Sequence, residues 1–275
     1  LCADREEWLS AWDLHSERLL VVYGNKEYTD ESFTAPEVVM VYSDQGLGGM
    51  SRTFHKLYQN HLCKSEWMNK KRPILSNNWE GTYFDFDTEK LIAMAESVKG
   101  LGIDTFVLDD GWFGKHDVDN CSLGDWVVYE KKLPNGLGGL ADKLNALGLK
   151  FGLWVEPEMV SPDSDCYRAH PDWAMTTDAY TPSQGRNQLT LDLTRDDVVE
   201  FIINTMTDVF RYGNIEYIKW DNNRHFSDVF SRQKDYKSGE YFHRYILGLW
   251  CRAEGLIYPF FDPKKCCGGD VKGDE

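Results

Sequence analysis

An apolar run gives way to alternating polar residues in the stretch Tyr217-Ile218-Lys219-Trp220-Asp221-Asn222-Asn223-Arg224. On a β-strand, every second residue faces the same side. Lys219, Asp221 and Asn223 are therefore predicted to point the same way at the strand's carboxyl end. The charge of Lys219 is expected to lower the pKa of Asp221 and to keep its carboxyl group ionised. A carboxylate in this place suits the nucleophile of a covalent glycosidase. The alternative is a surface ion pair at the rim of a sheet.

Strands and helices alternate on both sides of this stretch. Strands are predicted at residues 74–77, 105–108, 151–155, 189–191, 215–220 and 256–261. Helices are predicted from Asp87, over 137–147, from an acidic capping box at 194–197, and over 241–254. This alternation predicts an α/β fold with a parallel sheet. No G-x-G-x-x-G follows the first strand, which argues against a dinucleotide-binding fold.

Polar residues directly after the strands favour a (β/α)8 barrel of the TIM type, whose sites lie at the carboxyl ends of its strands. About six β units can be counted, so the barrel is expected to be incomplete at the C-terminus. Residues 1–50, with strands expected at 19–23 and 37–42, are predicted to end an N-terminal β-sandwich domain. A linking helix is expected within 51–72. The barrel would then occupy 73–262, and a polar tail 263–275.

Composition excludes several classes of function. The net charge of −15, from 45 acidic and 30 basic residues, disfavours nucleic acid or an anionic membrane as a partner. The sequence contains no run of about 18 apolar residues, so no membrane-spanning helix is predicted. The charged N-terminus does not match the pattern of a signal peptide. The 7 cysteines are scattered without a C-x-x-C, which favours reduced thiols in a cytoplasm. The histidines lack ligand spacing, so neither a metal nor a cofactor is expected.

Several predicted strands are followed by residues that could bind a ligand. The candidates are Asn77-Asn78-Trp79-Glu80, Asp109-Asp110-Gly111-Trp112, Trp154 with Glu156 and Glu158, Gly185-Arg186-Asn187, and Lys219 with Asp221 and Asn223. Each has a simpler explanation: the tryptophans could be packing residues, Asp-Gly a plain turn, the Glu-Pro-Glu segment a solvated loop, and the arginine a surface cation. Together, carboxylates and aromatics without a phosphate-binding loop indicate a neutral, hydroxyl-rich ligand.

Longer motifs identify a family. They lie between Thr34 and about Leu249. The stretches are Tyr42-Ser43-Asp44-Gln45-Gly46-Leu47-Gly48-Gly49-Met50-Ser51-Arg52, Arg72-Pro73-Ile74-Leu75-Ser76-Asn77-Asn78-Trp79-Glu80, Phe106-Val107-Leu108-Asp109-Asp110-Gly111-Trp112-Phe113-Gly114, Gly124-Asp125-Trp126, Gly152-Leu153-Trp154-Val155-Glu156-Pro157-Glu158-Met159-Val160, Gly185-Arg186-Asn187-Gln188 and Lys219-Trp220-Asp221-Asn222-Asn223-Arg224-His225. In all of these stretches the chain resembles the α-galactosidases of glycoside hydrolase family 36, of the bacterial type.

The resemblance implies a retaining hydrolase that removes terminal α-linked galactose from oligosaccharides such as raffinose and melibiose through a covalent galactosyl-Asp intermediate. It implies Asp221 as the nucleophile. The implied substrate-binding residues are Trp79, Asp109, Asp110, Trp154, Arg186, Lys219 and Asn223. It also implies a β-sandwich, a (β/α)8 barrel and a C-terminal β domain, and a cytoplasmic tetramer for the full-length form.

The chain departs from the family pattern at its C-terminal end. The family's general acid/base is an Asp in a Trp-Thr-Ser-Asp type motif that follows a Cys-Ser-Gly-Gly-Gly-Arg stretch, and neither motif occurs here; Cys267-Gly268-Gly269 is only a faint echo. The sequence is therefore expected to be a fragment that is weak or inactive on natural substrates. An α-N-acetylgalactosaminidase, a galactosyl transferase of the same family and a non-catalytic galactose-binding fragment remain alternatives. A metal-dependent hydrolase is disfavoured by the missing His pairs.

Overall fold

The computed structural model describes residues 8–13, 18–23, 38–62, 70–179, 181–234, 236 and 239–257. One compact unit runs from Pro73 to Leu256, and a second contains the described residues before Pro73. In the second unit, β1 (Trp8–Asp13) and β2 (Arg18–Tyr23) pair antiparallel. The same unit contains helix α1 (Gly46–Leu57), which continues into the π-helical turn η1 (Tyr58–Leu62). The linking helix thus begins earlier than predicted.

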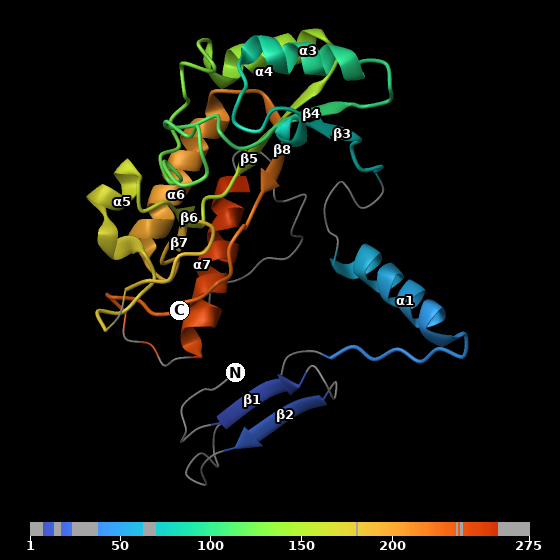
Figure 1. The fold of residues 1–275 in the computed structure, drawn as a ribbon. Helices are drawn as coiled ribbons and strands as arrows, with labels where there is room; N and C mark the ends of the chain where they lie inside the picture. Colours follow the sequence, from blue (N-terminus) through green and yellow to red (C-terminus); the bar gives the residue numbers. More distant parts are fainter. Residues whose placement is uncertain are drawn as a thin grey trace. The chain divides into compact units, whose positions relative to one another are not determined.

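A four-stranded parallel sheet forms the centre of the larger unit (Figure 1). Its strands lie in the order β3 (Leu75–Asn77), β4 (Thr105–Leu108), β5 (Lys150–Val155) and β8 (Ile215–Trp220). All three pairings are parallel. The strands are rich in β-branched and aromatic residues, and β4 is buried at every position, as expected for a sheet covered on both faces. The α/β prediction is confirmed.

Helices connect the strands of this sheet, and one more, α7 (Glu240–Ile257), follows its last strand. The connecting helices are α2 (Trp79–Thr82), α3 (Thr88–Val98), α4 (Gly136–Ala146), α5 (Asp165–Ala169), η3 (Pro171–Trp173) and α6 (Asp196–Arg211). Helix α3 starts as predicted: the side chain of Asp87 caps it by accepting a hydrogen bond of 2.8 Å from the backbone N–H of Lys90. Gly148, with φ of +82°, follows α4 in a left-handed conformation that favours glycine.

Three predictions about individual elements are wrong. The segment at 189–191 does not join the parallel sheet: β7 (Leu189–Thr190) pairs antiparallel with β6 (Met159–Val160). Residues 38–42 form no strand. The capping box at 194–197 does not form, because the Thr194 hydroxyl donates to Asp192 and Arg195, the N-cap of α6, has no side-chain capping bond.

The prediction of a last strand at 256–261 is also wrong for the two residues that the structure describes. Leu256 and Ile257 belong to α7, and the rest of 256–261 lies outside the described residues, as does the polar tail at 263–275.

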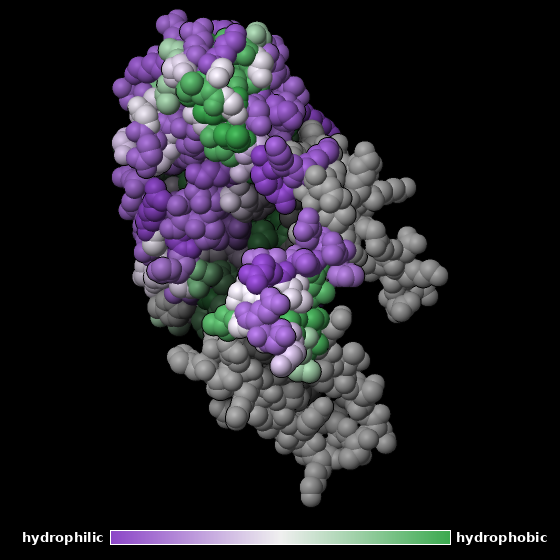
Figure 2. Space-filling view, turned by 90° about the vertical axis from the view of Figure 1, so that its right-hand side faces the viewer, coloured by the Kyte–Doolittle hydropathy of each residue, from purple (hydrophilic) through white to green (hydrophobic). Residues whose placement is uncertain are grey.

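The core of the larger unit lies between the sheet and its helices. Phe106, Leu108, Phe151 and Leu153 are completely buried on the central strands. Figure 2 shows a face of the molecule that is mostly hydrophilic, with hydrophobic side chains gathered near its upper end. Within the described residues, no helix combines the length and the apolar character that a membrane span requires.

Candidate active site

The carboxyl ends of the four parallel strands place the predicted residues side by side. Asn77 pairs with Val107, Leu108 with Leu153, and Trp154 with Lys219, so the residues after each strand reach the same edge of the sheet. The backbone N–H of Asp221 continues the ladder with a bond of 2.9 Å to the carbonyl of Val155. A pocket of about 140 Å³ opens at this edge, lined by Trp79, Asp109, Asp110, Trp154, Arg186, Lys219, Asp221 and Asn223. These are the eight residues singled out from the sequence.

Asp221 accepts hydrogen bonds on both carboxylate oxygens. Its Oδ2 accepts from Trp154 Nε1 at 2.9 Å and from Asn223 Nδ2 at 2.9 Å, and its Oδ1 accepts from the backbone N–H of Asn222 at 3.0 Å. Lys219 Nζ lies 3.9 Å from Oδ2. Burial alone would raise the pKa of Asp221, but these three hydrogen bonds and the charge of Lys219 outweigh it and hold the pKa below its ordinary value. Asp221 is thus kept ionised mainly by N–H donors, and less by Lys219 than the sequence indicated.

The lowered pKa of Asp221 predicts how the site responds to acid. A carboxyl group with a lowered folded-state pKa contributes stability that is present above its unfolded pKa of about 4 and is lost as the pH falls through the folded value. We expect the ¹³C resonance of the Asp221 carboxyl group to titrate below pH 4, and Trp154→Phe, which removes one donor, to raise the midpoint. An unchanged midpoint in Trp154→Phe would show that the indole N–H does not set this pKa.

Trp154 and Trp79 occupy different positions around the pocket. Trp154 is 2% exposed and lies parallel to Phe113, with ring centroids 6.2 Å apart, so it serves both as a packing residue and as a donor to Asp221. Trp79, at the start of α2, is held edge-to-face by Tyr83 and Phe84 at centroid distances of 5.2 and 5.1 Å. Both tryptophans therefore have fixed orientations at the pocket.

Asp109 is the carboxylate that Lys219 contacts most closely. Lys219 Nζ lies 2.8 Å from Asp109 Oδ2, which also accepts a bond from Asn77 Nδ2. The Asp109 backbone N–H donates to Asn78 Oδ1 at 2.7 Å. The contacts of Asp109 therefore join the ends of β3, β4 and β8.

Asp110 is buried beside His116. His116 Nδ1 contacts the carbonyl oxygen of Cys121, which can only accept, so this nitrogen carries a proton. His116 Nε2 lies 3.1 Å from the Asp110 carboxylate. It lies at this distance from both carboxylate oxygens, Oδ2 and Oδ1, so His116 holds the Asp110 carboxylate in place.

Gly111 allows the turn that presents Asp109 and Asp110. Its φ of +97° is left-handed, and a Cβ atom there would lie 2.9 Å from Phe84 Cδ1. We expect Gly111→Ala to lower the free energy of unfolding by about 1–3 kcal/mol through backbone strain, with a further loss from the steric contact. Gly148→Ala is the matched control, because its φ is +82° and no atom lies within 4 Å of the added Cβ. Equal losses in urea unfolding would exclude the steric contribution.

Arg186 and Asn187 form a tight turn between Gly185 and Gln188, whose backbone groups exchange hydrogen bonds of 3.2 and 3.0 Å. Both turn residues have positive φ, 53° and 60°. Such conformations in residues other than glycine gather at functional sites. The turn directs Arg186 Nη1 to within 2.6 Å of Asn223 Oδ1.

Sequence reasoning missed some residues that support the site. Glu156 was grouped with a possible solvated loop but is completely buried and contacts Asn223. The sequence singles out no histidine, because none has ligand spacing, and the contact of His116 with Asp110 has no signature in that spacing. Asn77 and Asn78 are among the ligand-binding candidates in the sequence, but the structure shows them holding Asp109 instead.

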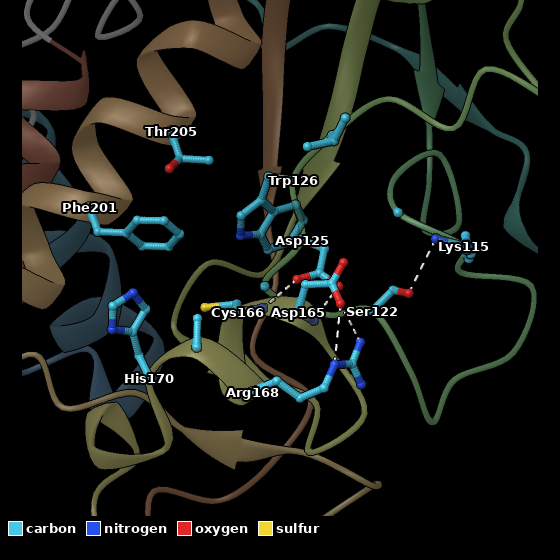
Figure 3. A pocket seen from close by; sticks show the side chains of 14 residues that line it. Lys115, Ser122, Asp125, Trp126, Asp165, Cys166, Arg168, His170, Phe201 and Thr205 are labelled. Atoms are coloured by element: carbon cyan, nitrogen blue, oxygen red, sulfur yellow. Dashed lines mark hydrogen bonds and ion pairs between the residues drawn. The ribbon is translucent and has the colours of Figure 1, made fainter.

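A second and larger pocket, of about 640 Å³, lies away from these residues. Figure 3 shows Arg168 pointing to Asp165, with Cys166, His170 and Phe201 around the same space. Arg168 pairs with Asp163 and Asp165 at 2.7 and 2.6 Å. Among the described residues, none of those that line this larger pocket has a buried side-chain nitrogen or oxygen atom without a hydrogen-bond partner. We therefore identify the smaller pocket, with its converging carboxylates, as the candidate active site.

Comparison with known proteins decides the family. The sequence profile described as "Melibiase" matches residues 32–275. The chain belongs to the melibiase family. It is 51% identical over 247 residues to "Alpha-galactosidase AgaA" of Geobacillus stearothermophilus, covering 89% of this chain and 34% of AgaA. It is 47% identical over 248 residues to "Alpha-galactosidase Mel36A" of Lactobacillus acidophilus, covering 89% of this chain and 34% of Mel36A. This melibiase chain thus spans about a third of the length of these curated relatives.

Solved structures agree with the assignment to the melibiases. The crystal structure of AgaA superposes with a TM-score of 0.80 at 50% identity, covering 88% of this chain and 33% of AgaA. A variant of AgaA in complex with raffinose superposes with a TM-score of 0.79 at 50% identity, with the same coverage. The parallel sheet of this melibiase chain is therefore part of the family's TIM-type barrel, as the sequence predicted.

Proposed function

We propose that this chain carries the nucleophile half of an α-galactosidase active site, in which Asp221 is the nucleophile. The observation that supports this most strongly is the arrangement of Asp221: an ionised carboxylate at the end of β8 that receives three N–H donors and faces a pocket with two further aspartates. The resemblance to AgaA and Mel36A supports the substrate class.

The substrate class follows from the polar groups of the pocket. Asp109 and Asp110 line the pocket and provide carboxylate acceptors for sugar hydroxyl groups. Lys219 and Arg186 provide donors, and the faces of Trp79 and Trp154 suit the apolar faces of a sugar ring. The raffinose bound to a variant of AgaA ends in an α-linked galactose. We infer that terminal α-galactosides of the raffinose and melibiose type are the substrates.

The first chemical step is a displacement at the anomeric carbon. A carboxylate oxygen of Asp221 attacks C1, a C1–O ester bond forms, and the bond from C1 to the leaving group breaks with its electron pair. Water then hydrolyses the ester, which releases galactose and restores the carboxylate. In a retaining enzyme a second carboxyl group lies about 5–5.5 Å from the nucleophile and protonates the leaving group. No residue of this chain is assigned to that role.

A glycosyl fluoride tests this function because fluoride leaves with little acid assistance. We expect the purified chain to release about one equivalent of fluoride from α-galactosyl fluoride in a burst, followed by slow turnover. The matched control is α-glucosyl fluoride, which differs only in the configuration at C4. An equal burst with both fluorides would contradict galactose specificity, and binding of galactose without any release would indicate a sugar-binding protein.

The remaining expectations stand as part of this proposal. We place the protein in the cytoplasm on the basis of its scattered cysteines. We assign the residues before α1 to the end of a β-sandwich domain, α1 and η1 (46–62) to the linking helix expected within 51–72, and residues 73–262 to the barrel. The full-length form is proposed to be a homo-oligomer, as a tetramer. Sedimentation of that form would test the oligomer.

A further inference from the structure

Glu156 is a completely buried carboxylate next to the candidate nucleophile. It follows β5 directly and is surrounded by N–H donors. Glu156 Oε1 accepts from the backbone N–H of Asn223, and Oε2 accepts from Asn223 Nδ2 at 3.2 Å and from Gln188 Nε2 at 3.1 Å. All three of these contacts come from N–H donors, which a carboxylate group can accept on both of its oxygens.

The side chain of Asn223 is fully engaged by these contacts. One Nδ2 proton is directed to Glu156 and the other to Asp221 Oδ2 at 2.9 Å, while Oδ1 accepts from Arg186 Nη1 at 2.6 Å. A flipped amide would turn its oxygen toward two carboxylates and its NH₂ group toward a guanidinium. The neighbours therefore fix the amide in one orientation.

We propose that Glu156 is the positioning residue of this site, which acts through Asn223 to orient and polarise the nucleophile Asp221. Because Glu156 anchors Asn223 at both the backbone and the side chain, the amide has no freedom to rotate away from Asp221. The catalytic role of Glu156 rests on the proposed function, in which Asp221 is the nucleophile. The contacts themselves do not depend on that function.

Electrostatics explains the strength of this constraint. Burial raises the pKa of Glu156 above its ordinary value, the charge of Asp221 raises it further, and the N–H bonds from Asn223 and Gln188 oppose these effects only in part. Two carboxylates are thus held near each other with one amide between them, donating to both. A neutral residue in place of Glu156 would weaken the hold on Asn223 from this side and leave Arg186 Nη1 and Asp221 as the remaining partners of the amide.

A neighbouring glutamate provides a matched control. Glu158 is also buried, but its carboxylate accepts from Trp220 Nε1 at 2.8 Å and from the Tyr245 hydroxyl at 2.7 Å, so it joins β8 to α7 and does not contact Asn223. Glu158→Gln and Glu156→Gln each remove one buried charge within the same segment. Only the second should affect Asp221.

The test is the titration of the Asp221 carboxyl group, followed by ¹³C NMR on the whole chain. We expect Glu156→Gln to raise the midpoint of Asp221, but less far than Asn223→Ala does, because the loss of the Glu156 charge by itself lowers the pKa of Asp221. The double variant should show no further rise above Asn223→Ala, because both substitutions act through one amide. Glu158→Gln should leave the midpoint unchanged. An Asp221 midpoint that stays or falls in Glu156→Gln, or a double variant whose midpoint rises above that of Asn223→Ala, would overturn the proposal.

A second measurement needs no variant and guards against misfolding. In the unsubstituted chain, the side-chain ¹⁵N resonance of Asn223 should shift with two titrations, those of Asp221 and of Glu156. A resonance that follows Asp221 alone would contradict the role of Glu156.

The rate of fluoride release separates this inference from the proposed function. With α-galactosyl fluoride, we expect Glu156→Gln to slow the burst by about 10²-fold, the scale of a small misplacement of a reacting group. No burst from the unsubstituted chain would refute the enzyme activity, and the NMR titrations would still decide the role of Glu156. A burst that Glu156→Gln leaves unchanged would refute only the positioning role.

Discussion

Asp221→Asn is expected to abolish the fluoride burst from α-galactosyl fluoride, with a loss of at least about 10⁴-fold in its rate, the scale found when catalytic side chains are removed. The amide that replaces the carboxylate is a poor nucleophile, so no ester forms at C1. It also offers an NH₂ group in place of one of two oxygens that accept from Trp154, Asn222 and Asn223. The burst is measured with a fluoride electrode.

The control for Asp221→Asn is Asp208→Asn, on the exposed side of α6, where Asp208 forms only a surface pair of 3.7 Å with Arg211. This control should retain the full burst. The free energy of unfolding should be measured for both variants, so that a loss of fold is recognised. A residual burst in a folded Asp221→Asn protein would assign the nucleophile to another residue.

Asp109→Ala is expected to lower the free energy of unfolding by about 3 kcal/mol. This is near the lower end of the losses in stability that follow when one partner of a buried ion pair is removed. The substitution leaves Asn77 without its acceptor and Lys219 without its nearest counter-charge. The side chain of Asp109 is 4% exposed, but that of Lys219 is 40% exposed, and solvation of the ammonium group limits the loss. The free energy is obtained from urea unfolding.

Asp109→Asn is the matched variant, because it keeps the shape and one acceptor oxygen. It should lose less stability than Asp109→Ala and should still bind galactose more weakly than the unsubstituted chain. If the alanine variant were as stable as the unsubstituted chain, the contacts among Lys219, Asn77 and Asp109 would contribute nothing to the fold.

The arrangement of the site residues within β8 could be predicted from the sequence because the geometry of a strand is regular. Alternation along the strand predicted that Lys219, Asp221 and Asn223 share a face, and Asp221 Oδ2 lies 3.9 Å from Lys219 Nζ and 2.9 Å from Asn223 Nδ2. The parallel order of strands predicted that Asp109 and Trp154 would reach the same edge. These predictions needed only the periodicity of single elements.

The contacts between distant strands could not be predicted in the same way. Lys219 lies closer to Asp109 than to Asp221, although β5 separates β4 from β8 in the sheet. The burial of Glu156 depends on Asn223 and Gln188, which approach from two other segments. The strand at 189–191 was assigned to the wrong sheet because an alternating pattern does not distinguish parallel from antiparallel partners.

The most direct test of this account is the site of covalent labelling. The purified chain is incubated with α-galactosyl fluoride, its intact mass is recorded, and the adduct is located by peptide fragmentation after acid quenching. We predict one galactosyl group per chain, attached to the carboxylate of Asp221. An adduct on Asp109 or Asp110, or no adduct in a chain shown to be folded by circular dichroism, would contradict the assembly of a nucleophile at the end of β8.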